Sequence, residues 1–216
     1  VTPATNAYAS PSKVSVDEGG LVTAAAVCGG YAALVVRATY PTLTTTVMRA
    51  LTGSSAPSSK QWNDAIENGA TYQNAAGTFS LVEQYSIYDI AGGDILASEY
   101  LSSTGTTTGH TMIVDSLWLD TATVATNIPG VPVADRWIVA IHDATSSPHG
   151  ASDSRWKADA NFSHDAGIGA GEIIIYADHL SGAIMGWAWS TTPSVVYQGT
   201  DETALRYRPM VAGRLA

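Results

Sequence analysis

The residue with the clearest chemical potential in this sequence is Cys28, because it is the single cysteine among 216 residues. It has no second cysteine for an intramolecular disulfide or for a multi-cysteine zinc site. The apolar spacing that follows predicts a helix from Cys28 to about Thr39, and Pro41 stops the pattern. Backbone N–H groups and the dipole at a helix N-terminus favour a thiolate. Cys28 is therefore either a nucleophile, with Gly29 and Gly30 leaving room for a substrate, or a small buried core residue.

A cysteine nucleophile needs a base, and His110 is the best placed of the five histidines. It opens an apolar, strand-like run after a loop of Gly and Thr; the alternative is a half-exposed histidine at a strand edge. Asp143 ends the next apolar run, where we expect its carboxylate to accept the Nδ1 proton of a histidine on a neighbouring strand. Its alternative role is to cap the turn that follows. Together the three residues predict a Cys28, His110 and Asp143 catalytic triad.

The elements that must position these residues change in type along the chain. Helices are expected over 28–39, 44–51 and 62–67, and strands over 94–98, 110–119, 136–143, 171–178, 184–190 and 207–214. Helices first and strands later predict an α+β fold in which N-terminal helices pack on one face of an antiparallel β-sheet. We expect a single domain over residues 1–216, with residues 1–20 as an N-terminal extension.

Composition and charge exclude several classes of function. The net charge is −9, which would repel a phosphate backbone, so no nucleic acid is expected as a partner. Only 13% of the residues are charged, so Thr, Ser, Asn, Gln and Gly must cover much of the surface. The longest uncharged run, residues 21–36, is too short to cross a bilayer, and no transmembrane segment is expected. The polar, proline-bearing start without a methionine is typical of a chain after leader removal, so export is expected.

Several motifs, taken in order, resemble the NlpC/P60 cysteine-hydrolase superfamily, within the broader papain-like fold. The matching segments are Cys28-Gly29-Gly30-Tyr31, Gly93-Asp94-Ile95-Leu96-Ala97, Gly109-His110-Thr111-Met112-Ile113-Val114, His142-Asp143-Ala144-Thr145, Gly167-Ile168-Gly169-Ala170-Gly171 and Val211-Ala212-Gly213-Arg214. They extend over almost the whole chain. The family commonly has an acidic residue or Asn before its cysteine and Ser after it, whereas this sequence has Val27 and Gly29.

The resemblance implies a papain-like, NlpC/P60-like core in which a helix carrying the cysteine packs on an antiparallel sheet carrying the histidine and a polar orienting residue. Cys28, His110 and Asp143 match these three positions. It also implies a cysteine peptidase or amidase of the bacterial cell envelope or secretome that cleaves an amide bond in a peptide or peptidoglycan-derived substrate, without a cofactor. The alternative is a catalytically silent binding module of the same fold that recognises envelope glycopeptides or a protein partner.

A group of polar residues around the third triad position also has the composition of a metal site. His142, Asp143, His149 and Asp153 offer imidazole and carboxylate ligands, but their spacing matches no recognised metal motif. We interpret them as the polar rim of a loop beside the active site and expect no metal. The superfamily often places a histidine third, so His142 and His149 remain alternatives to Asp143.

Two other patterns have a structural and a functional interpretation. The run from Gly167 to Gly171 precedes a strand-like segment rather than a helix, so a tight turn is favoured over a nucleotide-binding loop. Trp187, Trp189 and Tyr197 would either line a substrate groove or pack the sheet against a helix. We favour core packing for these three aromatic residues.

Overall fold

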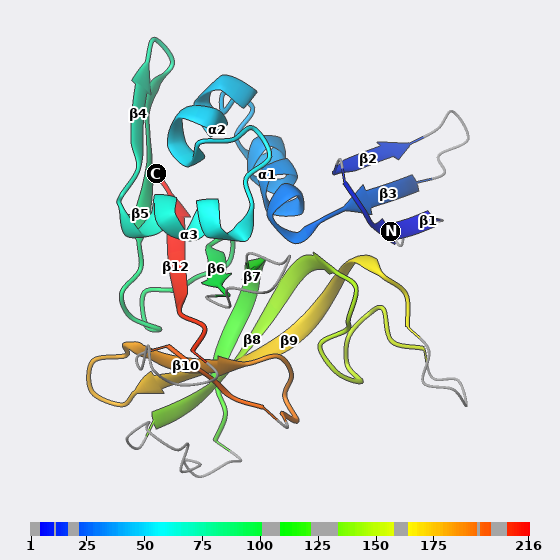
Figure 1. The fold of residues 1–216 in the computed structure, drawn as a ribbon. Helices are drawn as coiled ribbons and strands as arrows, with labels where there is room; N and C mark the ends of the chain where they lie inside the picture. The colour runs from blue at the N-terminus through cyan, green and yellow to red at the C-terminus, as the bar shows by residue number, and fades with distance from the viewer. Residues whose placement is uncertain are drawn as a thin grey trace.

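The computed structural model describes residues 5–10, 12–16, 22–100, 109–121, 134–157, 164–193, 195–199 and 207–216. Within these residues the chain forms two sheets and three helices (Figure 1). The helices are α1 (Cys28–Thr39), α2 (Thr45–Thr52) and α3 (Ser59–Glu67). The smaller sheet contains β1 (Thr5–Tyr8), β2 (Lys13–Val16) and β3 (Val22–Ala26). The larger contains β4 (Thr71–Asn74), β5 (Gly77–Glu83), β6 (Ile95–Glu99), β7 (Gly109–Leu119), β8 (Ala134–Thr145), β9 (Gly167–Asp178), β10 (Ile184–Ala188), β11 (Tyr197–Gln198) and β12 (Met210–Leu215).

The larger sheet has the order β11-β10-β9-β8-β7-β6-β12-β5-β4, and its strand pairs are antiparallel. It also curls, because β10 contacts β12 although β9, β8, β7 and β6 lie between them in the sheet. The curl encloses a buried cluster to which the helices contribute no residue. Its members include Leu96, Met112, Val139, Ile141, Ile173, Ile175, Trp187 and Met210. This part of the core is therefore built by the sheet and by the segment between β5 and β6, which contributes Ile87 and Ile90.

The helices form a second core on the other side of β6 and β12. Helix α3 packs against β6 and β12, and α1 packs against β7 and β8. Leu43, Met48, Trp62 and Ile66 are buried there with Leu81, Ile95 and Ile113 from the strands. The helix ends are defined locally: a capping box of Ser58 and Gln61 starts α3, and Gly53, with a φ of 78°, ends α2.

The expectation of an α+β, papain-like or NlpC/P60-like core is wrong. Strands make up 45% of the structure and helices 17%, so one large antiparallel sheet dominates in place of helices packed on a sheet. The sequence interpretation missed β1 to β5 and β11. Several of these are short and contain Ala, Asn or Gln, residues without a strong strand preference, and pairing with neighbouring strands decides their conformation.

The helices and the longer strands lie near the predicted positions. Helix α1 covers Cys28–Thr39, and α3 starts at Ser59 rather than Trp62. Strand β9 starts at Gly167, so the run from Gly167 to Gly171 is a strand and not the predicted tight turn. No helix among the described residues has the length and apolar character needed to cross a membrane.

Part of the expected N-terminal extension belongs to the smaller sheet. Strand β1 pairs in parallel with β3, and β2 pairs with the other edge of β3. The side chain of Asn6 on β1 donates to the carbonyl of Ile168 at 2.5 Å and accepts from its N–H at 2.8 Å. Strand β3 leads directly into α1 (Figure 1). This sheet therefore connects the start of α1 with β9.

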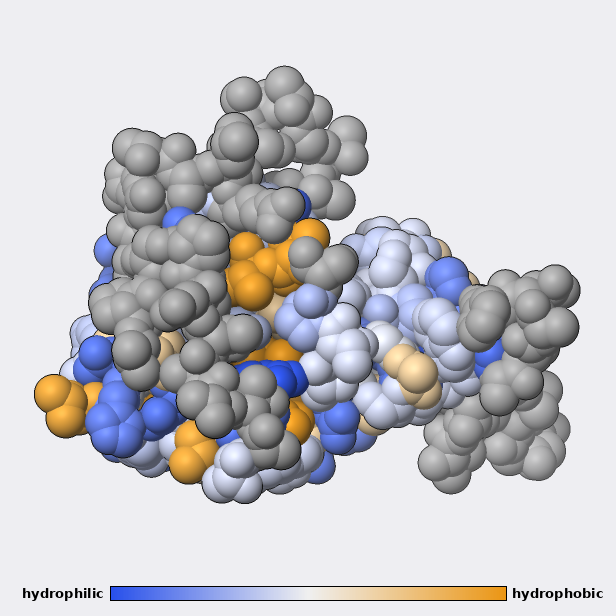
Figure 2. Space-filling model, turned by 90° about the horizontal axis from the view of Figure 1, so that it is seen from below, coloured by the Kyte–Doolittle hydropathy of each residue, from blue (hydrophilic) through white to orange (hydrophobic). Residues whose placement is uncertain are grey.

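The surface has the uncharged character that the composition indicates. Seen from below, wide areas have near-neutral hydropathy, and apolar residues gather in a patch near the centre (Figure 2).

Candidate active site

The thiol of Cys28 lies at the first residue of α1, where Val27 caps the helix without a side-chain hydrogen bond. Cys28 is only 7% exposed. Its Sγ is 3.3 Å from the hydroxyl oxygen of Ser59, at the start of α3, and 4.0 Å from the hydroxyl oxygen of Tyr8 on β1. Since N–H groups in the first helical turn have no acceptor within the helix, the backbone at Cys28 offers donors beside the thiol.

The hydroxyl of Ser59 is oriented by a second hydroxyl group. Thr111 on β7 donates to the Ser59 oxygen at 2.8 Å. The Ser59 proton is then available to Sγ of Cys28, 3.3 Å away. A hydrogen bond donated to sulfur stabilises the thiolate more than the thiol.

The electrostatic environment favours a charged Cys28–His110 pair. Burial opposes ionisation of Cys28, but a side-chain hydrogen bond and the charge of His110, with Ser59, lower the thiol pKa to about 6. Burial likewise opposes protonation of His110, but hydrogen bonds to Asp143 and Cys28 raise its pKa to about 9. Between these pH values the pair is a thiolate and an imidazolium.

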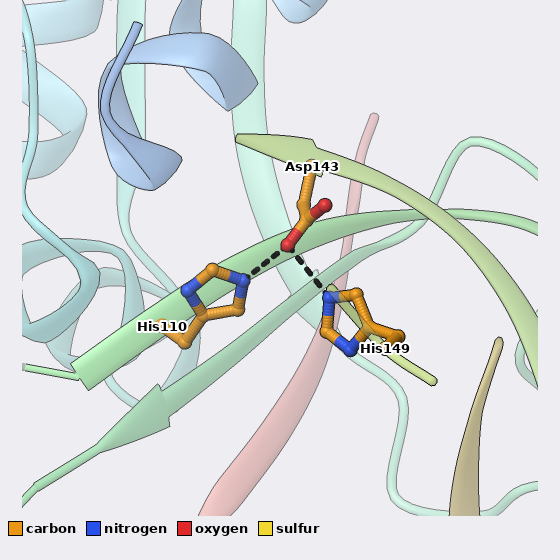
Figure 3. A group of neighbouring side chains, drawn as sticks. All are labelled: His110, Asp143 and His149. Carbon is orange, nitrogen blue, oxygen red and sulfur yellow. Dashed lines mark hydrogen bonds and ion pairs between the residues drawn. The ribbon is translucent and has the colours of Figure 1, made fainter. Parts of the chain in front are cut away.

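The sheet register explains how His110 reaches Asp143. Met112 on β7 is directly opposite Asp143 on β8. His110 is two residues before Met112, so its side chain is on the same face of the sheet and diagonal to Asp143. The His110 Nε2 atom lies 2.5 Å from Asp143 Oδ2 (Figure 3).

This contact corrects the expected ring orientation. The sequence interpretation assigned Nδ1 to the carboxylate, whereas the structure places Nε2 there. Nδ1 is therefore the ring nitrogen left for the hydrogen bond between His110 and Cys28.

Asp143 is fully buried and contacts two further residues that the sequence interpretation did not assign to the triad. His149 Nε2 lies 2.9 Å from the same Oδ2 (Figure 3), and its Nδ1 lies 2.8 Å from the carbonyl oxygen of Trp189. Arg155 Nη1 forms an ion pair with Oδ1 at 2.8 Å. Burial opposes ionisation of Asp143, but hydrogen bonds from His110 and His149 hold its pKa well below the usual range.

Arg155 is itself held by a buried carboxylate. Its Nε donates to Asp153 Oδ1 at 2.8 Å and its Nη2 to Asp153 Oδ2 at 2.6 Å, a bidentate pair. Nη1 also donates to the carbonyl of Gly167 at 3.0 Å. Arg155 is therefore fixed between two aspartates, and the Arg at this position carried no signal in the sequence beyond lying two residues after Asp153.

The glycines of β9 leave space for this network. Gly169 is directly opposite Asp143, and a Cβ atom there would lie 2.6 Å from Arg155 Nε. A Cβ atom on Gly171 would lie 2.7 Å from Asp153 Oδ2 and 2.8 Å from His149 Cβ. The glycine run that resembled a turn is thus a strand whose missing side chains accommodate the charges around Asp143.

The four polar residues predicted to form a rim beside the site do not all lie together: Asp143, His149 and Asp153 do, and His142 does not. His142 lies apart, exposed on the opposite face of β8, with its Nε2 3.9 Å from Asp115 Oδ1. Within the part of the chain that the structure describes, His110, Asp143 and His149 have the ligand atoms and proximity to hold a metal ion. Both imidazoles already contact Asp143 Oδ2, and Arg155 places a positive charge at Oδ1, so a cation there would be repelled and would have to displace these contacts.

The aromatic residues separate into core and site. Trp187 is fully buried in the cluster enclosed by the sheet. Trp189 stacks on His149, with ring centres 4.1 Å apart, and its edge lies against His110 at 4.8 Å. Trp189 and Tyr197 also line a cavity beside His110. Core packing is therefore confirmed for Trp187, while Trp189 and Tyr197 pack against the same cluster and also line the cavity.

Comparison with known proteins gives a relative but no family. Over 136 residues the chain is 29% identical to the uncharacterized protein R653 of Acanthamoeba polyphaga mimivirus, an alignment that covers 60% of this chain and 55% of the relative. The chain thus matches about half of that protein's length. No family model and no solved structure matches the chain. The resemblance to NlpC/P60 hydrolases stays a prediction.

Proposed function

We propose that the protein is a cysteine-dependent hydrolase that cleaves an amide bond with Cys28, His110 and Asp143. The observation that carries this proposal is a buried histidine, His110, whose Nε2 lies 2.5 Å from Asp143 Oδ2 and which lowers the pKa of a thiol at a helix start. A nucleophile, a base and an orienting carboxylate in this order are what acyl transfer to cysteine requires.

The reaction follows from the charge state of the pair. The Cys28 thiolate attacks the substrate carbonyl, and the His110 imidazolium then gives its proton to the departing amine. This leaves a thioester on Cys28. Neutral His110 takes a proton from water, the resulting hydroxide attacks the thioester, and the acid product leaves with the thiolate and imidazolium restored. Asp143 fixes the ring and stabilises its positive charge throughout.

The developing oxyanion needs hydrogen-bond donors near Sγ. The backbone N–H of Cys28 is one such donor, and the Tyr8 hydroxyl, 4.0 Å from Sγ, is placed to be the second. Burial and the neighbouring Cys28 charge raise the pKa of Tyr8, so its hydroxyl keeps its proton at neutral pH.

The substrate class is proposed from the resemblance stated above, as a peptide of the bacterial cell wall. The test is incubation with a mixed peptidoglycan digest, with products followed by mass spectrometry. We expect Cys28→Ala and His110→Ala to abolish product formation and Asp143→Asn to reduce it by about two to four orders of magnitude. Unchanged turnover by Cys28→Ala would disprove the mechanism. Binding of digest components without any product, in the unmodified protein and Cys28→Ala alike, would instead identify a binding module.

A further inference from the structure

Two cavities flank the Cys28–His110 pair and share Tyr8 and Gly109 in their walls. The first has a volume of about 270 Å³ and is lined by Cys28, the start of α1, and residues 56–59 and 61 before and within α3. The second has a volume of about 350 Å³ and contains His110 in its wall. The nucleophile therefore opens to one side and the base to the other.

The proposed reaction assigns one cavity to each part of the substrate. In the proposed reaction the acyl carbon bonds to Sγ of Cys28, whereas the departing nitrogen must lie within reach of the His110 proton. The acyl part of the substrate thus faces the start of α1, where the backbone donors are. The amine part faces the cavity that contains His110.

The wall of the second cavity has a distinct composition. Besides His110 and Gly109 it contains four aromatic residues and three hydroxyl residues: Tyr8, Tyr100, Trp189, Tyr197, Thr145, Ser146 and Ser147. Asp, Glu, Lys and Arg are absent from this set. The neighbouring Arg208 is held between two of the rings, with its guanidinium carbon 4.0 Å from the centres of both Tyr100 and Tyr197.

From this arrangement we propose that the second cavity binds the amine side of the substrate and selects a residue with an aromatic group over one with a cationic side chain. The inference rests on the proposed hydrolase function and adds the class of leaving group. Aromatic walls bury a flat ring favourably. A cationic side chain would lose its hydration there beside His110 and the neighbouring Arg208, with no acidic residue in this wall to pair with. The volume suits one such side chain rather than an extended peptide.

Aminolysis tests the cavity without knowledge of the natural substrate. p-Nitrophenyl acetate acetylates Cys28 and releases p-nitrophenol. An added amine then attacks the thioester from the leaving-group side and gives its proton to His110, which restores the Cys28 thiolate and the His110 imidazolium. We expect phenylalaninamide to capture the acetyl group about tenfold more efficiently than glycinamide. Lysinamide should be no better than glycinamide. Mass spectrometry of the N-acetylated amines gives the ratios.

Variants that place a charge at the exposed Ser147 test the same cavity in a second way. Ser147→Asp should favour lysinamide and Ser147→Lys should favour aspartic acid α-amide, whereas the exposed Thr42→Asp, outside the cavity wall, should leave the ratios unchanged. Equal capture of all amines, with no response to the Ser147 variants, would overturn the cavity assignment and leave the hydrolase intact. Failure of Cys28 to be acetylated at all would instead overturn the hydrolase.

Discussion

Arg155 and Asp143 form a fully buried ion pair, with Nη1 2.8 Å from Oδ1, on the side of the carboxylate opposite His110. The pair leaves Oδ2 to the two histidines. Arg155 therefore balances the charge of Asp143 without competing for the oxygen that orients the base.

Removing this arginine should disturb the thiol that lies beyond the histidine. In Arg155→Gln the site becomes more negative, so we expect the pKa of Cys28 to rise from about 6 and the protein to lose about 3–5 kcal/mol of stability, as when one partner of a buried pair is removed. Arg155→Lys should retain part of the stability and part of the lowering of the Cys28 pKa. The pH dependence of iodoacetamide labelling and urea unfolding measure the two effects.

A second Arg–Asp pair provides the control for Arg155. Arg214 donates through Nε and Nη2 to Asp94 at 2.7 and 2.9 Å, outside the site. Arg214→Gln should lower stability without moving the labelling curve. If Arg155→Gln also leaves the labelling curve in place, Arg155 has a structural role only.

The pH range in which Cys28 is reactive should be set by its interaction with His110. Labelling by iodoacetamide should rise near pH 6, well below the ordinary thiol pKa of about 8.5, and turnover should fall again near pH 9 as His110 loses its proton. In His110→Gln burial acts on the thiol with Ser59 still opposing it but without the charge of His110, so the Cys28 pKa should rise well above about 6. His142→Gln, an exposed histidine on the opposite face of β8, should behave like the unmodified protein. A labelling curve like that of free cysteine would contradict the assignment.

The contribution of the Asp143 carboxylate to the free energy of unfolding should be measurable from its loss at acid pH. Its pKa is lower in the folded chain than the usual value of about 3.9, so its contribution is present above that pH and is lost as the pH falls below it. The free energy of unfolding should there decline by about 1.4 kcal/mol more per pH unit in the unmodified protein than in Asp143→Asn. Urea titrations from pH 6 down to the acid limit of folding test this, and parallel curves would refute it.

A substitution at a glycine of β9 can displace the Arg155 side chain without removing any charge from the residues around Asp143. Gly169→Ala places a Cβ 2.6 Å from Arg155 Nε, so Arg155 must shift. We expect a loss of about 1–3 kcal/mol, as for overpacking in a core, together with a rise in the Cys28 pKa. Gly199→Ala, whose Cβ would lie 3.4 Å from the nearest atom, is the matched substitution. Labelling of Gly169→Ala that matches the unmodified protein would show that Arg155 tolerates the shift.

Chelation should leave the protein unchanged, because both imidazoles already contact Asp143 Oδ2 and the Arg155 guanidinium places a positive charge 2.8 Å from Oδ1. We expect the same Tm and the same labelling rate after treatment with EDTA. A fall in Tm that zinc restores would make His110, Asp143 and His149 a metal site.

The sequence predicted the parts of the site that depend on local pattern. Cys28 at the start of a helix, and His110 and Asp143 on adjacent strands, follow from apolar spacing and from turn residues. Arg155 and Tyr8 did not follow, because what makes them relevant is tertiary: a strand register that places Gly169 beside Asp143, and a small sheet that carries Tyr8 to the thiol.

The fold was predicted less well than the site for a related reason. Residues such as those of β4 and β5 are partly exposed and alternate weakly, so their strand conformation depends on pairing with β12 and with each other. The curl that buries Trp187 between distant strands also has no local signature.

The hydrogen bonds between Asn6 and Ile168 join β1 to β9, two segments that lie 162 residues apart in the chain. Cys28 leaves the ribosome before its histidine, its aspartate and the strand that anchors β1. Until β9 is complete the nascent chain carries an ordinary thiol, mostly protonated at neutral pH. In the proposed hydrolase, the activated thiol can therefore form only after the chain has been synthesised as far as β9.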